Sequence, residues 1–136
     1  MTRKNPHKNK ILKELRHHLT DEKGIIFAYL HGSVLDEKEF NDLDVAIYLD
    51  RETSTKSDTI DLEISLSLKI ENFLRLPVDV KILNFAPLSF RYHVTKGNLI
   101  LSHDESVREE YICRTWSEYF DFQPVARIYL QEALAA

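Results

Sequence analysis

The chain has 136 residues, of which 43% are hydrophobic and 29% charged, as expected for one globular domain with its own core. Its 22 acidic and 18 basic residues give a formal net charge of −4, which argues against a broad surface for direct nucleic-acid binding. The single cysteine, Cys113, excludes an internal disulfide framework and a Cys-rich zinc site. With no long apolar run and no apolar signal segment, we expect a cytoplasmic protein that does not enter the membrane.

The N-terminal third predicts a helix followed by two strands. Leucine and isoleucine at helical spacing predict a helix over residues 9–19. A β-branched and aromatic run after Gly24 predicts a strand over 25–30, and a second apolar run predicts a strand over 43–49. In that second strand Val45 and Ile47 face opposite to Asp42 and Asp44, so one face is expected to be buried and the other to carry carboxylates.

Residues 55–76 fit two interpretations. Apolar and polar residues alternate from Ile60 to Ile70, which is a strand signal, although a strand of this length would far exceed the usual five or six residues. The same residues also form two stripes at helical spacing. One stripe comprises Leu62, Leu66, Ile70 and Phe73, and the other Ile60, Ile64 and Leu68.

The remaining elements alternate between strand and helix. Residues 78–83 predict a strand with Asp79 and Lys81 opposite its apolar face, 87–95 a short helix, and 98–102 another strand. A long helical region follows, capped by Ser102 or Asp104 and expected to bend or break before Pro124. We therefore expect a single domain over residues 1–136, with its core at about 25–102 and a C-terminal helical region at about 104–135.

The stretch between the first two strands carries the clearest chemical signal. Asp42 and Asp44 are two residues apart, so on a strand they share a face, with roughly 6.5–7 Å between their Cα atoms. Carboxylates this close repel each other unless a cation lies between them, and oxygen ligands suit Mg²⁺ bound to phosphates. Gly32 allows close backbone approach to a phosphate, and Ser33 adds a hydroxyl donor. The pattern therefore predicts a nucleotide site.

Gly32-Ser33, a spacer of eight residues and then Asp42-x-Asp44 between strands resemble the signature of the DNA polymerase β-type nucleotidyltransferase superfamily. The short chain is similar to its minimal nucleotidyltransferases. Among these, the segment "APLSFRYHVTKGNLI" and the aromatic C-terminal region most resemble the antitoxins encoded beside HEPN-domain toxins. The likeness extends over about residues 25–129.

This resemblance implies an α/β (α+β) fold, in which helices flank a small mixed sheet, and it favours the helical interpretation of residues 55–76, with two buried faces. It also implies a transferase of the EC 2.7.7 type that moves AMP from ATP to a tyrosine of a cognate HEPN ribonuclease toxin, with which it forms an oligomer. In this scheme Gly32 and Ser33 bind the nucleotide. Asp42, Asp44 and Asp79 hold two Mg²⁺ ions, and Asp79 could accept the proton.

Several alternatives stay open. The spacer carries Asp36, Glu37 and Glu39 where many members have an Arg-Gly pair, and His31 replaces a usual apolar or aromatic residue. The acidic spacer favours an antitoxin that neutralises its toxin by binding alone. A small-molecule nucleotidyltransferase, acting for instance on an antibiotic, is another possibility. Asp79 could also be a solvent-facing acid paired with Lys81, and "NDLD" could be a turn and cap.

Overall fold

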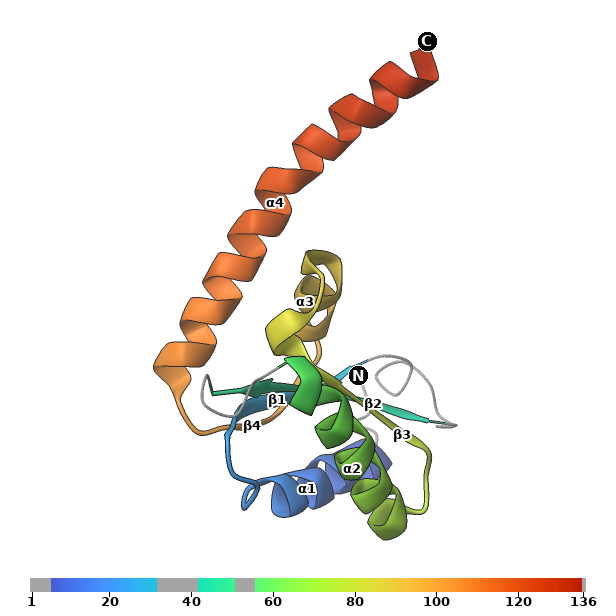
Figure 1. The fold of residues 1–136 in the computed structure, drawn as a ribbon, viewed down its shortest axis with the longest axis vertical. Coiled ribbons are helices and arrows are strands. Elements are labelled where there is room, and N and C mark those ends of the chain that lie inside the picture. Colours follow the sequence, from blue (N-terminus) through green and yellow to red (C-terminus); the bar gives the residue numbers. More distant parts are fainter. Residues whose placement is uncertain (1–5, 32–41, 51–55, 136) are drawn as a thin grey trace.

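The computed structural model describes residues 6–31, 42–50 and 56–135, which form a four-stranded sheet covered by helices on both faces (Figure 1). The elements in chain order are α1 (Pro6–Leu19), β1 (Ile25–His31), β2 (Leu43–Leu49), α2 (Lys56–Leu74), β3 (Val78–Ile82), the 3-10 turn η2 (Leu83–Phe85), α3 (Leu88–Thr95), β4 (Asn98–Ser102) and α4 (Glu105–Ala135). The helical interpretation of the ambiguous segment is confirmed, because α2 is one continuous helix.

The sheet is mixed and has the order β3-β2-β1-β4. β1 pairs antiparallel with β2 and β4, whereas β2 and β3 run parallel and are joined by the crossover helix α2. Within the described residues this leaves β3 at one edge of the sheet, beside the central strand β2. The predicted α/β fold with a small mixed sheet is therefore confirmed.

Two apolar cores lie on opposite faces of the sheet, as the alternating strand pattern predicts. Leu30, Val45 and Val80 point towards α1 and α2 and are fully buried there. Tyr29 and Ala46, from alternate positions, point towards α3 and α4 and belong to the second core. The acidic residues Asp44 of β2 and Asp79 of β3 occupy the same alternate positions as Tyr29 and Ala46. They therefore lie on this second face of the sheet.

Side chains of α2 satisfy the free backbone donors of the edge strand. The amide N–H of Val78 donates to Glu71, that of Val80 to Ser67 and that of Ile82 to Glu63, at 2.9, 3.1 and 2.9 Å. The acceptors are four residues apart on the helix, so successive turns meet alternate residues of the strand. These hydrogen bonds fix the position of β3 and protect its edge.

The second apolar stripe of α2 is exposed, so the expectation of two buried faces is wrong. Ile60, Ile64 and Leu68 have exposed fractions between 56 and 60%, whereas Leu66 and Ile70 are buried. The physical reason is position: α2 lies along the sheet edge, where only one of its faces meets the strands. No element of the described chain covers the other stripe.

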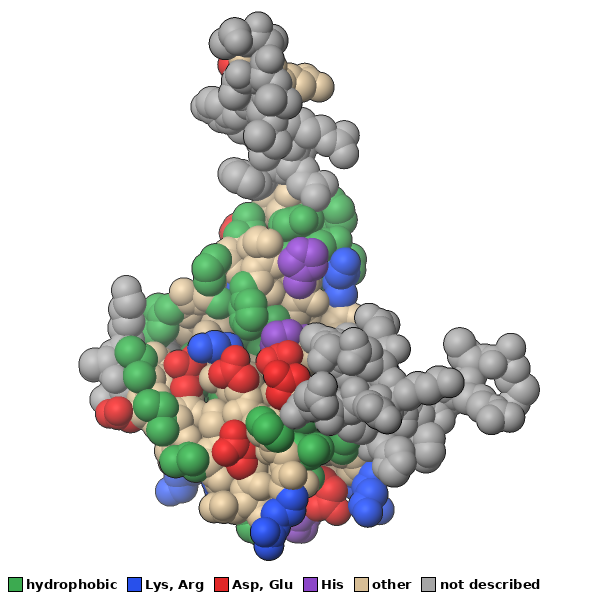
Figure 2. All heavy atoms as spheres, turned by 90° about the vertical axis from the view of Figure 1, so that its right-hand side faces the viewer, with side chains coloured by type: hydrophobic (Ala, Val, Ile, Leu, Met, Phe, Trp, Pro, Cys, Tyr) green, Lys and Arg blue, Asp and Glu red, His purple; other side chains and the backbone are tan. Residues whose placement is uncertain are grey.

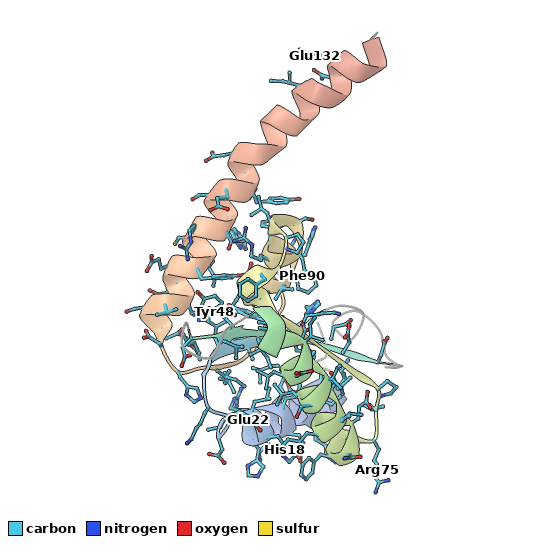
Figure 3. All side chains as sticks on the ribbon, in the orientation of Figure 1. His18, Glu22, Tyr48, Arg75, Phe90 and Glu132 are labelled. Carbon is cyan, nitrogen blue, oxygen red and sulfur yellow. The ribbon has the colours of Figure 1, made fainter. Side chains whose placement is uncertain are left out.

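The long helix α4 begins at the predicted cap, because Asp104 accepts a hydrogen bond from the amide of Val107 at 3.2 Å. Arg108 anchors the helix to the sheet by donating to the Tyr29 hydroxyl at 2.8 Å. α4 continues through Pro124 to Ala135, so the expected break is absent; proline costs the helix a hydrogen bond and crowds the preceding turn, but the helix continues on both sides of it. Beyond its contacts with α3, the helix extends away from the sheet, with Glu132 near its far end (Figures 1 and 3).

Candidate active site

Three polar side chains form a row across one end of the sheet. His31 is the last residue of β1 and pairs in register with Asp44 of β2, which in turn pairs with Asp79 of β3. Neighbouring strands lie about 4.8 Å apart, and residues in register share a face, so these three groups are adjacent. Figure 2 shows acidic side chains gathered on this side of the molecule. The structure therefore aligns two of the predicted carboxylates, Asp44 and Asp79, on neighbouring strands.

Asp42 lies just before β2 and is exposed to solvent. No group of three or more His, Cys, Asp and Glu side chains within residues 6–31, 42–50 and 56–135 is close enough to hold one ion. Two carboxylates are nevertheless sufficient for Mg²⁺ that also binds substrate phosphates. The oxygen donors of Asp44 and Asp79 thus fit a magnesium–nucleotide site. Gly32 and Ser33 lie outside the described residues, directly after His31 in the chain.

The charges in this row disfavour a metal-free ionised state. Burial raises the pKa of the Asp44 carboxyl, repulsion from Asp42 and Asp79 raises it further, and only His31 opposes this shift. A bound cation would relieve this repulsion, which is the electrostatic condition expected of a metal-binding carboxylate. Burial lowers the pKa of His31 and favours its neutral form, although Asp44 and Asp79 act in the opposite direction.

Lys81 lies beside Asp79, with 3.8 Å between Nζ and the carboxylate oxygen, and both side chains are about half exposed. This is the geometry expected if Asp79 were an ordinary surface acid on an edge strand. An exposed ion pair of this kind contributes little energy, so Lys81 does not prevent Asp79 from binding another cation. The structure thus contains both the ion pair and the alignment of Asp79 with Asp44.

His31 is a member of the row for which the sequence predicted no role. Its Nε2 atom is buried without a hydrogen-bond partner in the described part of the chain. The rings of His31 and Phe90 form a T-shaped pair with 5.3 Å between their centroids, and Phe90 lies on α3 over the sheet (Figure 3). Gly97 packs closely behind it, since an added Cβ would lie 3.2 Å from the His31 Cβ. Only the register of β1 and β2 reveals that His31 lies beside Asp44, because the Gly32-Ser33 motif and its spacer separate the two residues in the sequence.

The comparisons with known proteins agree with this geometry. The family model for the polymerase β nucleotidyltransferases matches residues 13–106, so the chain belongs to this family. No curated protein sequence matches it. The described part of the chain contains no helix long and apolar enough to cross a membrane.

Solved structures with the same fold come from toxin–antitoxin complexes. One is the toxin–antitoxin MntA–HepT (17% identity, TM-score 0.69, covering 93% of this chain and 98% of that one). A second contains a tri-AMPylated Shewanella oneidensis HEPN toxin in complex with an MNT antitoxin (18%, 0.63, 96% of each chain). A third is a toxin–antitoxin with AMP-PNP (21%, 0.68, 93% and 98%). At these identities the likeness concerns the fold.

Proposed function

We propose that this protein is a cytoplasmic antitoxin that transfers AMP from ATP to a tyrosine hydroxyl of a cognate HEPN-domain toxin, with which it assembles. The observation that carries the proposal is the in-register pair Asp44 and Asp79. They lie near the starts of β2 and β3, the two strands that come next after the Gly32-Ser33 motif in the chain. Membership of the nucleotidyltransferase family supports the reaction class. The fold shared with a complex of an AMPylated HEPN toxin supports the nature of the acceptor.

In the proposed reaction, the tyrosine oxygen attacks the α-phosphorus of ATP. The bond between the α-phosphorus and the bridging oxygen breaks, and pyrophosphate leaves. The proton of the hydroxyl passes to Asp79, whose carboxylate is about half exposed on the outermost strand, β3. The backbone and hydroxyl of Gly32-Ser33 bind the β- and γ-phosphates. AMP on the tyrosine then blocks cleavage of RNA by the toxin.

Asp42, Asp44 and Asp79 would hold Mg²⁺, with two ions in this proposal. When bound, Mg²⁺ supplies Lewis-acid stabilisation of the phosphates and lowers the pKa of the acceptor hydroxyl. Asp44 would be the central ligand, because it lies in register with Asp79 and its side chain is only partly exposed to water. Replacing it is therefore expected to have the largest effect.

The test is intact-mass spectrometry of the protein encoded next to this gene, expected to be a HEPN-domain toxin, after incubation with this chain, Mg²⁺ and ATP. The control is a variant with both Asp42→Ala and Asp44→Ala. A gain of one or more AMP units with the wild type, absent with the variant, supports the proposal. An unchanged mass with both proteins would overturn it for this acceptor.

Neutralisation by contact alone is the second candidate. It is favoured by the acidic spacer with Asp36, Glu37 and Glu39 in the sequence. The described residues also contain no group of three or more His, Cys, Asp and Glu side chains that could hold a metal ion. In that case the double variant would still block RNA cleavage by the toxin, and the mass of the toxin would not change.

A further inference from the structure

An apolar groove runs beside β3, between α2 and the chain that follows the strand. It consists of two hollows of about 410 and 320 Å³ that share Ile60, Glu63 and Lys81. We call it the edge groove. Its apolar lining comes mainly from Ile60, Ile64, Leu68, Phe85 and Pro87.

The apolar side chains of the edge groove have no cover from the described chain. The α2 stripe of Ile60, Ile64 and Leu68 is more than half exposed, and so is Phe85 across the groove. Figure 2 shows hydrophobic side chains directly beside the acidic group on this face. A continuous exposed apolar surface next to a polar site is typical of a protein-binding surface.

The groove is continuous with the candidate active site. Asp79 and Lys81 line it, and Asp79 is aligned with Asp44. The predicted phosphate-binding residues Gly32 and Ser33 follow β1, which lies on the opposite side of β2 from β3. A nucleotide bound near the end of β1 would therefore approach Asp44 and Asp79 from that side of the sheet. The other side of Asp79, which borders the groove, would stay accessible to the acceptor.

We propose that the edge groove binds the segment of the acceptor protein that carries the modified tyrosine. This inference rests on the proposed function and adds the surface that selects the acceptor. Apolar side chains flanking the tyrosine contact Ile64 and Leu68, and the hydroxyl reaches Asp79. The carboxylates of Asp79 and Glu63 outnumber the cation of Lys81 along the groove, which favours a segment with a basic residue near the tyrosine.

The test compares two arginine substitutions on the same helix. Leu68→Arg places a charge in the groove, whereas Phe73→Arg places one at an equally exposed apolar position outside its lining. Phe73 stacks on His18 at 3.8 Å, so its replacement is also a stringent control for stability. With the neighbouring HEPN-domain protein as acceptor, we expect Leu68→Arg to raise the acceptor KM by roughly tenfold or more. Phe73→Arg should not change it, and the KM for ATP should stay at the wild-type value in both variants.

Binding of the same acceptor without ATP gives a second measurement that does not depend on transfer. Leu68→Arg should weaken this complex by a similar factor, and a photoreactive residue at position 64 should cross-link to the acceptor. If wild-type protein transfers AMP and Leu68→Arg matches it in acceptor KM and in binding, the groove proposal is overturned while the proposed function stands. If Leu68→Arg instead only dissociates copies of this chain from one another, the groove is a self-association surface and the proposal is equally overturned.

If the wild type transfers no AMP, the proposed function fails. Binding of the neighbouring protein by the two variants then decides whether the edge groove is its docking surface. Weaker binding by Leu68→Arg than by Phe73→Arg would then still support acceptor docking. Equal binding by both variants would overturn it.

Discussion

Replacement of Ser67 by alanine tests whether α2 holds the strand that carries Asp79. Ser67 Oγ accepts the amide hydrogen of Val80 at 3.1 Å, at the middle of three such contacts. Its loss leaves a partly buried donor without its partner, which costs about 1–3 kcal/mol. Alanine is also a better helix former than serine by about 0.5 kcal/mol, which partly offsets this cost.

Ser65→Ala is the matched control, because Ser65 lies on the same helix and is exposed. The change in helix propensity is the same in both variants, so the difference between them isolates the hydrogen bond. We expect Ser67→Ala to be about 1–3 kcal/mol less stable than Ser65→Ala in urea unfolding, with an unchanged m-value. Equal free energies of unfolding for the two variants would refute the conclusion that this contact stabilises the sheet edge.

Three further predictions concern the parts of the fold around the site. Gly97→Ala should destabilise the protein by about 1–3 kcal/mol in urea unfolding, because the new Cβ would lie 2.5 Å from the Leu30 carbonyl oxygen; wild-type stability would contradict this. Asp104→Ala should cost about 1 kcal/mol through loss of the α4 cap, measured by thermal unfolding, and Asp104→Asn should retain most of it. Because the pKa of His31 is lower in the folded than in the unfolded chain, its contribution to stability is complete above the ordinary value of about 6.5 and declines as the pH falls below it. The loss of stability between about pH 7.5 and about pH 5.5 should therefore be smaller in His31→Gln than in wild type, and equal losses would contradict this.

The sequence predicted most of the elements because their signals are local. Apolar runs predicted β2 and β3, and the placement of Asp44 and Asp79 at alternate positions correctly put Val45 and Val80 on the buried face. The cap at Asp104 and the start of α4 also followed from local pattern. By contrast, two apolar stripes on α2 do not reveal how many neighbours the helix has. Only its position at the sheet edge decides that Leu66 is buried and Ile64 exposed.

The candidate site was predictable in part. Asp44 and Asp79 stood out as acids on otherwise apolar strands, and the structure aligns them. The parallel register that joins them depends on the crossover through α2, which no spacing in the sequence encodes. His31 was missed for the same reason, since its proximity to Asp44 depends on the antiparallel register of β1 and β2. The roles of Gly32 and Ser33 remain predictions, as they lie outside the described residues.

Label transfer from ATP tests the central claim most directly. The chain and the protein encoded next to its gene would be incubated with Mg²⁺ and ATP labelled at either the α- or the γ-phosphorus, with Asp79→Asn as a control. We predict that label from the α-position becomes covalently attached to the acceptor, that label from the γ-position is released in pyrophosphate, and that Asp79→Asn lowers the rate by roughly a hundredfold or more. Attachment of the γ-label would indicate phosphoryl transfer instead, and attachment of neither label to an acceptor that still binds would contradict the assignment of Asp44 and Asp79 to a nucleotidyl-transfer site.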